Sequence, residues 1–248
     1  MTKRGIPAIV AAALVAMTFG ATQPAVAQHR PAGDRCVLPP LIPMPPASDF
    51  ASSVDNRYFP LVPGTTMFYR GTEGPDRVQD VVSVTHGTKT ILGVHATVVL
   101  DKVWTNGKPS EKTFDWYAQD RRGNVWYLGE AAYDYVHGHW VKADDSWESG
   151  RKGAKPGLIM EAHPKVGDAY RQEFSRGNAE DAARVLNTNT TVSVPYGTFH
   201  HALKTRECTP LEPGVIDHKH YARGIGEVSE EQVAGGSAHL VLVSIKQD

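Results

Sequence analysis

The sequence is poor in cysteine: Cys36 and Cys208 are the only two among 248 residues. Two thiols cannot by themselves make a zinc or iron–sulfur site, which excludes a centre held by cysteines alone. In an oxidising compartment an even pair is first interpreted as a disulfide. The bond would close a long loop and contribute on the order of 4 kcal/mol in the chain-entropy model. Two separate buried thiols are the alternative.

The sequence also lacks an excess of charge of one sign. Lysine and arginine total 26, aspartate and glutamate total 27, and no basic stripe is visible along the chain. Without residues 1–27, which contain Lys3 and Arg4 but no acidic residue, 24 basic residues face 27 acidic ones. A nucleic-acid partner needs a concentrated basic surface, so no such partner is predicted.

Long hydrophobic runs are absent except at residues 6–19. This run follows Lys3 and Arg4 and precedes the small-residue site Ala25-Val26-Ala27. The order is that of a cleavable secretory signal, which predicts a signal peptide over residues 1–27. The run is short for a transmembrane helix, and an N-terminal membrane anchor is the alternative. After cleavage no integral membrane segment would remain, and the expected localisation is secreted or periplasmic.

Motifs for catalysis and cofactor binding are missing as well. The chain has no Gly-x-Ser-x-Gly elbow, no His-Glu-x-x-His pair and no glycine-rich phosphate loop before a helix. Its carboxylates are scattered, and a linear sequence cannot show the facing pair that a glycosidase needs. We therefore predict no cofactor, and the sequence leans against an enzyme without excluding one.

What the chain does contain is a succession of short segments rich in β-branched and aromatic residues, separated by turn residues. Asn106-Gly107 is a hairpin signal because both residues tolerate positive φ. Residues 28–54 are proline-rich and predict an extended arm. Only residues 179–186 show helical spacing. We predict an all-β domain over 55–248, an antiparallel curved sheet or half-barrel with at most one short helix.

Two stretches, residues 63–130 and 166–230, resemble each other. Each opens with a glycine before a polar and aromatic strand. They close on Trp116-Tyr117-Ala118 with Gly123-x-Val125, and on His220-Tyr221-Ala222 with Gly226-x-Val228. Tyrosine suits a half-buried strand, and glycine permits the bend after it. The pattern predicts two similar β repeats within one scaffold, and chance likeness between β-rich stretches is the alternative.

The residues Val192-Ser-Val-Pro-Tyr-Gly-Thr-Phe199 and Tyr221-Ala-Arg-Gly-Ile-Gly-Glu-Val228 resemble a pattern of uncharacterised, secreted bacterial proteins. That pattern is Val-Pro-x-Gly-Thr-Phe followed by Tyr-Ala-x-Gly-x-Gly-x-Val, with proline where this chain has Arg223. The group is distantly similar to the half-barrel proteins that carry lipoproteins in the bacterial envelope. The resemblance implies a curved sheet and no particular activity, since fold alone does not establish function.

Aromatic residues are the first candidates for a binding site, because a concave sheet lined with them could hold an apolar or glycan ligand. The alternative is that they fill the core. His218 and His220 are weak metal candidates, because residues two apart on a strand face the same side. The predicted ligand-binding residues are Phe114, Trp116, Trp126, Tyr133 and Trp140.

Three functions are compatible with these patterns. The first is a secreted or periplasmic, non-enzymatic binding protein for an apolar small molecule or lipid. The second is an extracellular hydrolase. The third is a protein-interaction module that docks a partner through its proline-rich arm or an exposed sheet edge.

Overall fold

The computed structural model describes residues 36–248, so the predicted signal peptide and the first part of the proline-rich arm lie outside the described residues. The described chain is mostly strand, with one 3-10 turn, η2 (Ala47–Asp49). The strands are β1 (Val54–Asn56), β2 (Phe59–Leu61), β3 (Thr65–Glu73), β4 (Asp76–Ile91), β5 (Val94–Thr105), β6 (Lys108–Gln119), β7 (Val125–Val136), β8 (His139–Lys142), β9 (Trp147–Glu148), β10 (Lys155–Met160), β11 (Ala169–Arg171), β12 (Glu173–Phe174), β13 (Ala182–Val194), β14 (Gly197–Cys208), β15 (Ile216–Ala222), β16 (Gly226–Ala234) and β17 (His239–Gln247).

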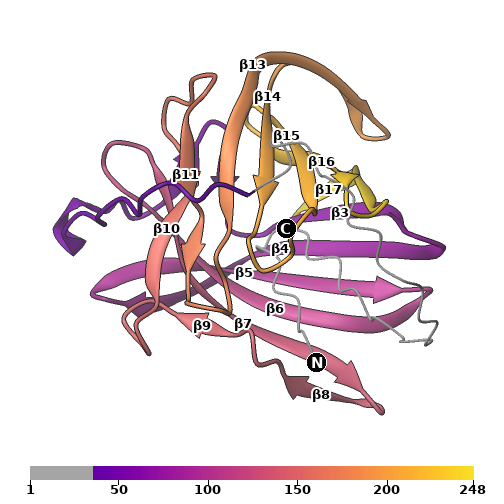
Figure 1. The fold of residues 1–248 in the computed structure, drawn as a ribbon, viewed down its shortest axis with the longest axis horizontal. Helices are drawn as coiled ribbons and strands as arrows, with labels where there is room; N and C mark the ends of the chain where they lie inside the picture. Colours follow the sequence, from indigo (N-terminus) through magenta and orange to yellow (C-terminus); the bar gives the residue numbers. More distant parts are fainter. Residues whose placement is uncertain (1–35) are drawn as a thin grey trace, which may run out of the picture.

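One antiparallel sheet holds nearly all of these strands, which confirms the predicted all-β curved sheet. Its order is β11-β13-β14-β15-β16-β17-β3-β4-β5-β6-β7-β10-β12, and β8 and β9 also pair with β7. Figure 1 shows β4 to β7 side by side in the lower half, with β13 and β14 crossing them steeply above. The sheet curls so far that its two ends approach each other. The Asn106-Gly107 turn joins β5 and β6 with positive φ at both residues, as predicted.

The segment Ala169–Phe174 nearly closes the sheet into a barrel. Its first part, β11, pairs with β13, and its second part, β12, pairs with β10 at the opposite end of the strand order. Gln172 lies between the two and is fully buried. One short segment thus reaches both ends of the sheet, and it pairs with β13 at Ala182–Arg184 and with β10 at Lys155 and Pro156.

Close packing at this closure leads to a prediction for Gly157→Ala. A Cβ atom at Gly157 would lie 2.5 Å from the carbonyl oxygen of Arg171, and backbone cannot move aside like a side chain. We expect a loss of about 1–3 kcal/mol of unfolding free energy, the usual cost of overpacking, measured by urea denaturation. Gly197→Ala, whose nearest neighbour would be 3.7 Å away on the Phe199 ring, is the matched control. Equal stability of the two variants would contradict the tight closure.

The expected helical segment at residues 179–186 is wrong, because most of it belongs to strand β13. Ala183 and Val185 are buried and Arg184 between them is exposed, the alternation of a strand. An eight-residue helix is marginal by itself, whereas β13 gains a ladder with β14 along its length. Strand β10 was not predicted either, because Pro156 and Gly157 mark a loop in the sequence.

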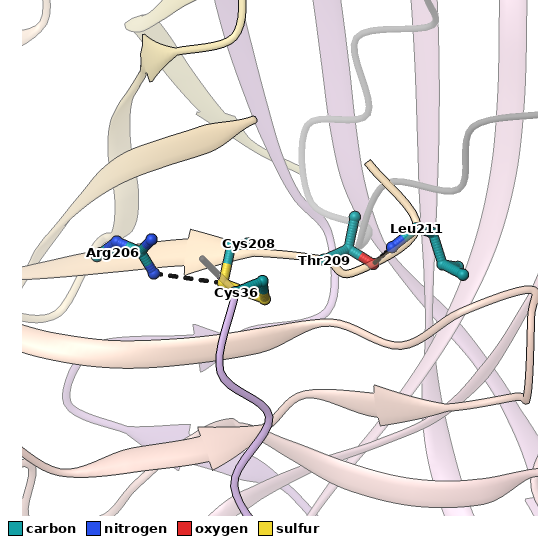
Figure 2. Close-up of a disulfide and its surroundings, with 5 residues drawn as sticks. All are labelled: Cys36, Arg206, Cys208, Thr209 and Leu211. Carbon is teal, nitrogen blue, oxygen red and sulfur yellow. Dashed lines mark hydrogen bonds between the residues drawn. A yellow bond between two sulfur atoms is a disulfide. The ribbon is translucent and has the colours of Figure 1, made fainter. Parts of the chain in front are cut away.

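The predicted disulfide is confirmed. Cys36 and Cys208 are bonded, with their Cα atoms 5.5 Å apart, a normal separation for a disulfide. Figure 2 shows Cys208 at the end of β14, with Arg206 donating a hydrogen bond to its sulfur at 3.3 Å. The bond fixes the start of the described chain to the second half of the sheet.

Aromatic side chains fill the core inside the first half of the sheet. The rings of Tyr117 and Tyr127 stack at 4.7 Å, with Phe59 and Trp147 packed edge-on against them. In the second half, Tyr221 of β15 is equally buried. Both Tyr117 and Tyr221 lie just before the turn that leads to the next strand. The duplication itself stays a prediction.

Candidate ligand-binding site

The sheet from β3 to β8 separates charges between its two faces. Neighbouring residues on a strand point to opposite faces, and the buried carboxylates Asp80, Asp101 and Asp115 define the inner one. Strand pairing places each carboxylate of these six strands at an inner-face position. These residues are Glu73, Asp76, Asp80, Asp101, Glu111, Asp115, Glu130 and Asp134.

Burial shifts the pKa values of three of these inner carboxylates upward, which favours their protonated forms. Burial, and then the neighbouring Asp101, raises the pKa of Asp80 well above its usual range. Burial also raises the pKa values of Asp115 and Glu130, and the Tyr127 hydroxyl lies within hydrogen-bond distance, 2.8 Å, of an oxygen of each. A deprotonated carboxylate would lose its hydration here, so the neutral acid is favoured. These groups are closed off from solvent and do not form a cleft.

In the second half of the sheet a single buried cation, Lys219 of β15, contacts three carboxylates. Its Nζ lies 3.6 Å from an oxygen of each. Tyr221 and Thr205 donate hydrogen bonds to one of the three, Glu207. The nearby charges raise the pKa of Lys219 despite its burial. The arrangement keeps Lys219 charged and fixed within the core. The three carboxylates are Glu207, Glu227 and Glu230.

The outer face of the same strands carries cations and aromatic rings instead. A line of directly paired residues crosses from β3 to β8 on this face. It consists of Phe68, Val81, Lys102, Lys112, Tyr133 and Lys142. We call this surface the basic face, and define it as these residues together with Arg70, Arg77, Trp104, Phe114, Trp140 and Lys246.

A hollow of about 340 Å³ lies in the basic face, where β17, β3, β4 and β5 meet. This volume is within the range of small-molecule sites. Phe68, Val81, Trp104 and Val243 supply apolar walls, and Arg70 and Lys246 supply positive charge. The Nζ of Lys246 lies 5.3 Å above the Phe68 ring. Gln79 and Ser244 add hydrogen-bonding groups to the lining of the hollow.

Three of the predicted ligand-binding residues gather beside this hollow on the basic face. The Nζ of Lys112 lies over the rings of Phe114, Tyr133 and Trp140, at 5.8, 5.0 and 4.7 Å. Phe114 and Tyr133 also meet edge-on. This cluster is a cation surrounded by aromatic rings, the arrangement of a cation–π site.

The other two predicted residues are separate from that cluster. Trp116 packs with Ile91, and the Nζ of Lys89 covers its ring at 3.3 Å. Trp126 is buried and donates its indole hydrogen bond to Asp120 at 3.0 Å. Both tryptophans therefore have partners within the protein, and their part in ligand binding stays a prediction.

His218 and His220 share one face of β15, as expected for residues two apart. Burial and the neighbouring Lys204 lower the pKa of both, for His220 to about 4. His220 Nδ1 is hydrogen-bonded with the Ser229 hydroxyl at 3.0 Å. Across residues 36–248, no three side chains of histidine, cysteine, aspartate or glutamate form a group that could hold a metal ion.

The residues of the hollow were missed from the sequence. They belong to four strands, and β17 is far from β3 in the chain although Ser244 pairs with Phe68. The spacing Phe68-x-Arg70 and Lys102-x-Trp104 was a usable signal, because it places an aromatic ring and a cation on one face. Which face was exposed depended on strand pairing, and this was not visible in the sequence.

Comparisons with known proteins give little guidance. No family model matches the chain, and none of the curated proteins matches it. Among solved structures, a protein of Parabacteroides distasonis described as a "putative lipoprotein" matches with a TM-score of 0.40 and 13% identity, over 77% of this chain and 99% of that one. A likeness this weak says nothing about what this chain binds. No helix within the described part of the chain is long and apolar enough to cross a membrane.

Proposed function

We propose that the chain is a secreted or periplasmic, non-enzymatic binding protein whose ligand is an anionic amphiphile, an apolar chain that ends in a phosphate or carboxylate. The disulfide supports export, because such bonds persist in oxidising compartments. The observation that carries the proposal is the hollow in the basic face, which combines apolar walls with two cations.

The chemistry of the hollow selects among the ligands that the sequence allows. Phe68, Val81 and Trp104 remove apolar surface from water, which favours an alkyl chain. Arg70 and Lys246 favour a negative end group, and arginine can bind it with two parallel hydrogen bonds. A purely neutral lipid would leave the cations without a partner in the ligand, so the anionic form is preferred.

The test is isothermal titration calorimetry with decyl phosphate and decyl maltoside, each below its micelle concentration. We expect saturable binding of decyl phosphate and much weaker binding of decyl maltoside. Arg70→Gln should weaken decyl phosphate binding about ten-fold through loss of a charge-assisted hydrogen bond. Trp104→Ala should weaken the binding of both ligands, because it removes part of the apolar wall of the hollow.

Lys152→Gln is the matched control, since Lys152 is an exposed cation of the turn before β10. It should bind decyl phosphate as the unchanged protein does. Absence of saturable binding, or equal binding by the Arg70, Trp104 and Lys152 variants, would reject the hollow as the ligand site.

A further inference from the structure

Because the carboxylates of β3 to β8 lie on the inner face of the sheet, the outer face of these strands is more basic than the composition of the chain suggests. Eight carboxylates of β3 to β8 occupy inner positions, and those at Asp80, Asp101, Asp115 and Glu130 are buried. Six cations project from the basic face, namely Arg70, Arg77, Lys102, Lys112, Lys142 and Lys246. A near-neutral chain therefore presents one broad face of a single charge sign, and such a face attracts anions.

Exposed apolar side chains lie at one rim of this face, on the hairpin formed by β7 and β8. Tyr135, Val136, Trp140 and Val141 are each between 37% and 44% exposed. All four residues of β8 are exposed, and β8 pairs only with β7. Figure 1 shows β8 at the lower periphery of the molecule. The hairpin therefore extends beyond the sheet with apolar groups on both of its sides.

We propose that the basic face docks on an anionic lipid bilayer, with the β7–β8 hairpin entering the interfacial layer of the membrane. Tryptophan and tyrosine prefer that layer, because their rings are apolar and their N–H and O–H groups reach water. Lysines can lie flat with their apolar stems and place the ammonium group at lipid phosphates. Juxtaposed cations and anionic headgroups attract each other with a strength that adds over the charges.

An acidic polysaccharide fits the same face less well. The Lys112 ammonium already covers the Phe114, Tyr133 and Trp140 rings, so these are not free to stack on sugar rings. The side chains of Val136 and Val141 cannot form hydrogen bonds with a sugar, whereas a bilayer would remove their apolar surface from water. The mixture of exposed valines, interfacial aromatic residues and lysines thus favours lipid over glycan.

Membrane docking does not require the hollow to hold a ligand, so it can succeed or fail independently of the proposed function. It would bring the hollow against the headgroups, since Arg70 and Lys246 are on the same face as Lys102 and Lys112. A single anionic amphiphile could then exchange between bilayer and hollow without crossing water. The membrane-docking face and the hollow would then act in sequence, as two steps in the transfer of one ligand.

The experiment is co-sedimentation of the full chain with vesicles. One set contains phosphatidylglycerol and phosphatidylcholine in equal parts, and the other contains phosphatidylcholine alone. We expect binding to the anionic set, weakened by added salt, and little binding to the neutral set. The triple variant Lys102→Gln, Lys112→Gln, Lys142→Gln should bind about 100-fold more weakly, since each cation near an anionic surface contributes about five-fold.

The matched control removes the same charge elsewhere. Lys152→Gln, Lys165→Gln, Arg176→Gln replaces three exposed cations of turns outside strands β3 to β8 and should keep its vesicle binding. Trp140→Ser with Val141→Ser should weaken binding while leaving the cations in place. Thermal unfolding shows whether each variant is folded. None of the residues replaced in these variants lines the hollow.

Three results would overturn docking. The first is failure of the unchanged protein to sediment with anionic vesicles. The second is equal loss of binding in the two triple variants, which would indicate attraction by net charge alone. The third is binding to an acidic polysaccharide such as alginate in the absence of any vesicle binding. Loss of decyl phosphate binding with intact vesicle binding would instead reject only the hollow.

Discussion

Lys219→Met is expected to destabilise the protein by about 3–5 kcal/mol at neutral pH, the usual cost of removing one partner from a buried ion pair. Methionine keeps most of the volume, so the loss is electrostatic. Without the ammonium group, Glu207, Glu227 and Glu230 would face each other with no cation among them. The measurement is the free energy of unfolding in urea, with circular dichroism to report the folded fraction.

Two further variants make this result specific to Lys219. Lys204→Met, on the neighbouring strand β14 and half-buried, should cost less than about 1 kcal/mol, as most surface changes do. Adding Glu227→Gln to Lys219→Met should recover part of the loss, because it removes one of the three carboxyl groups left crowded together without a cation. Similar losses for Lys219→Met and Lys204→Met would show that the buried contacts contribute little.

Stability should fall as the pH rises from about 5 to about 8. Burial raises the pKa of Asp181 from 3.8 to about 8 and that of Glu230 from 4.5 to about 8, although Thr209 and Lys219 respectively oppose the shift. Below its ordinary pKa each group is protonated in both the folded and the unfolded chain. Between the two values only the unfolded chain releases the proton, so folding is progressively disfavoured until the folded group also ionises.

The expected size follows from this proton difference. One such group lowers the unfolding free energy by about 1.4 kcal/mol per pH unit in that window. Several groups acting together should remove several kcal/mol between mildly acidic and mildly alkaline solution, measured by urea denaturation at constant ionic strength. Asp181→Asn, which cannot ionise, should give a shallower profile. A stability that rises with pH would contradict protonated acids in the core.

The fold class was predictable because it depends on local patterns. Short β-branched segments and the Asn106-Gly107 turn predicted antiparallel strands, and these are present. The disulfide was predictable from the number of cysteines and the oxidising compartment that residues 1–27 led us to expect. The closure of the sheet around Gln172 was not predictable. The segment that contains it pairs with β10 and β13, and no sequence pattern marks these pairings. Pro156 and Gly157 even indicated a loop where β10 forms.

The candidate site was only partly visible for a similar reason. Phe114, Tyr133 and Trp140 were selected as aromatic residues close in sequence, and they meet in space around Lys112. The hollow depends on Lys246 and Phe68, which come together only when β17 pairs with β3. The separation of charges between the two faces depends on the register of six strands. Register is a property of strand pairing between distant segments, and the composition of the chain contains no information about it.

The pairing of β17 with β3 also constrains how the molecule can be made. These two strands join the halves of the sheet, yet residues 239–247 leave the ribosome long after residues 65–73. Until they emerge, β3 and β16 each have one edge without a partner strand, and contacts so distant along the chain form slowly. A newly made chain therefore stays open through most of its synthesis, a state that a translocation channel can thread and a finished barrel cannot.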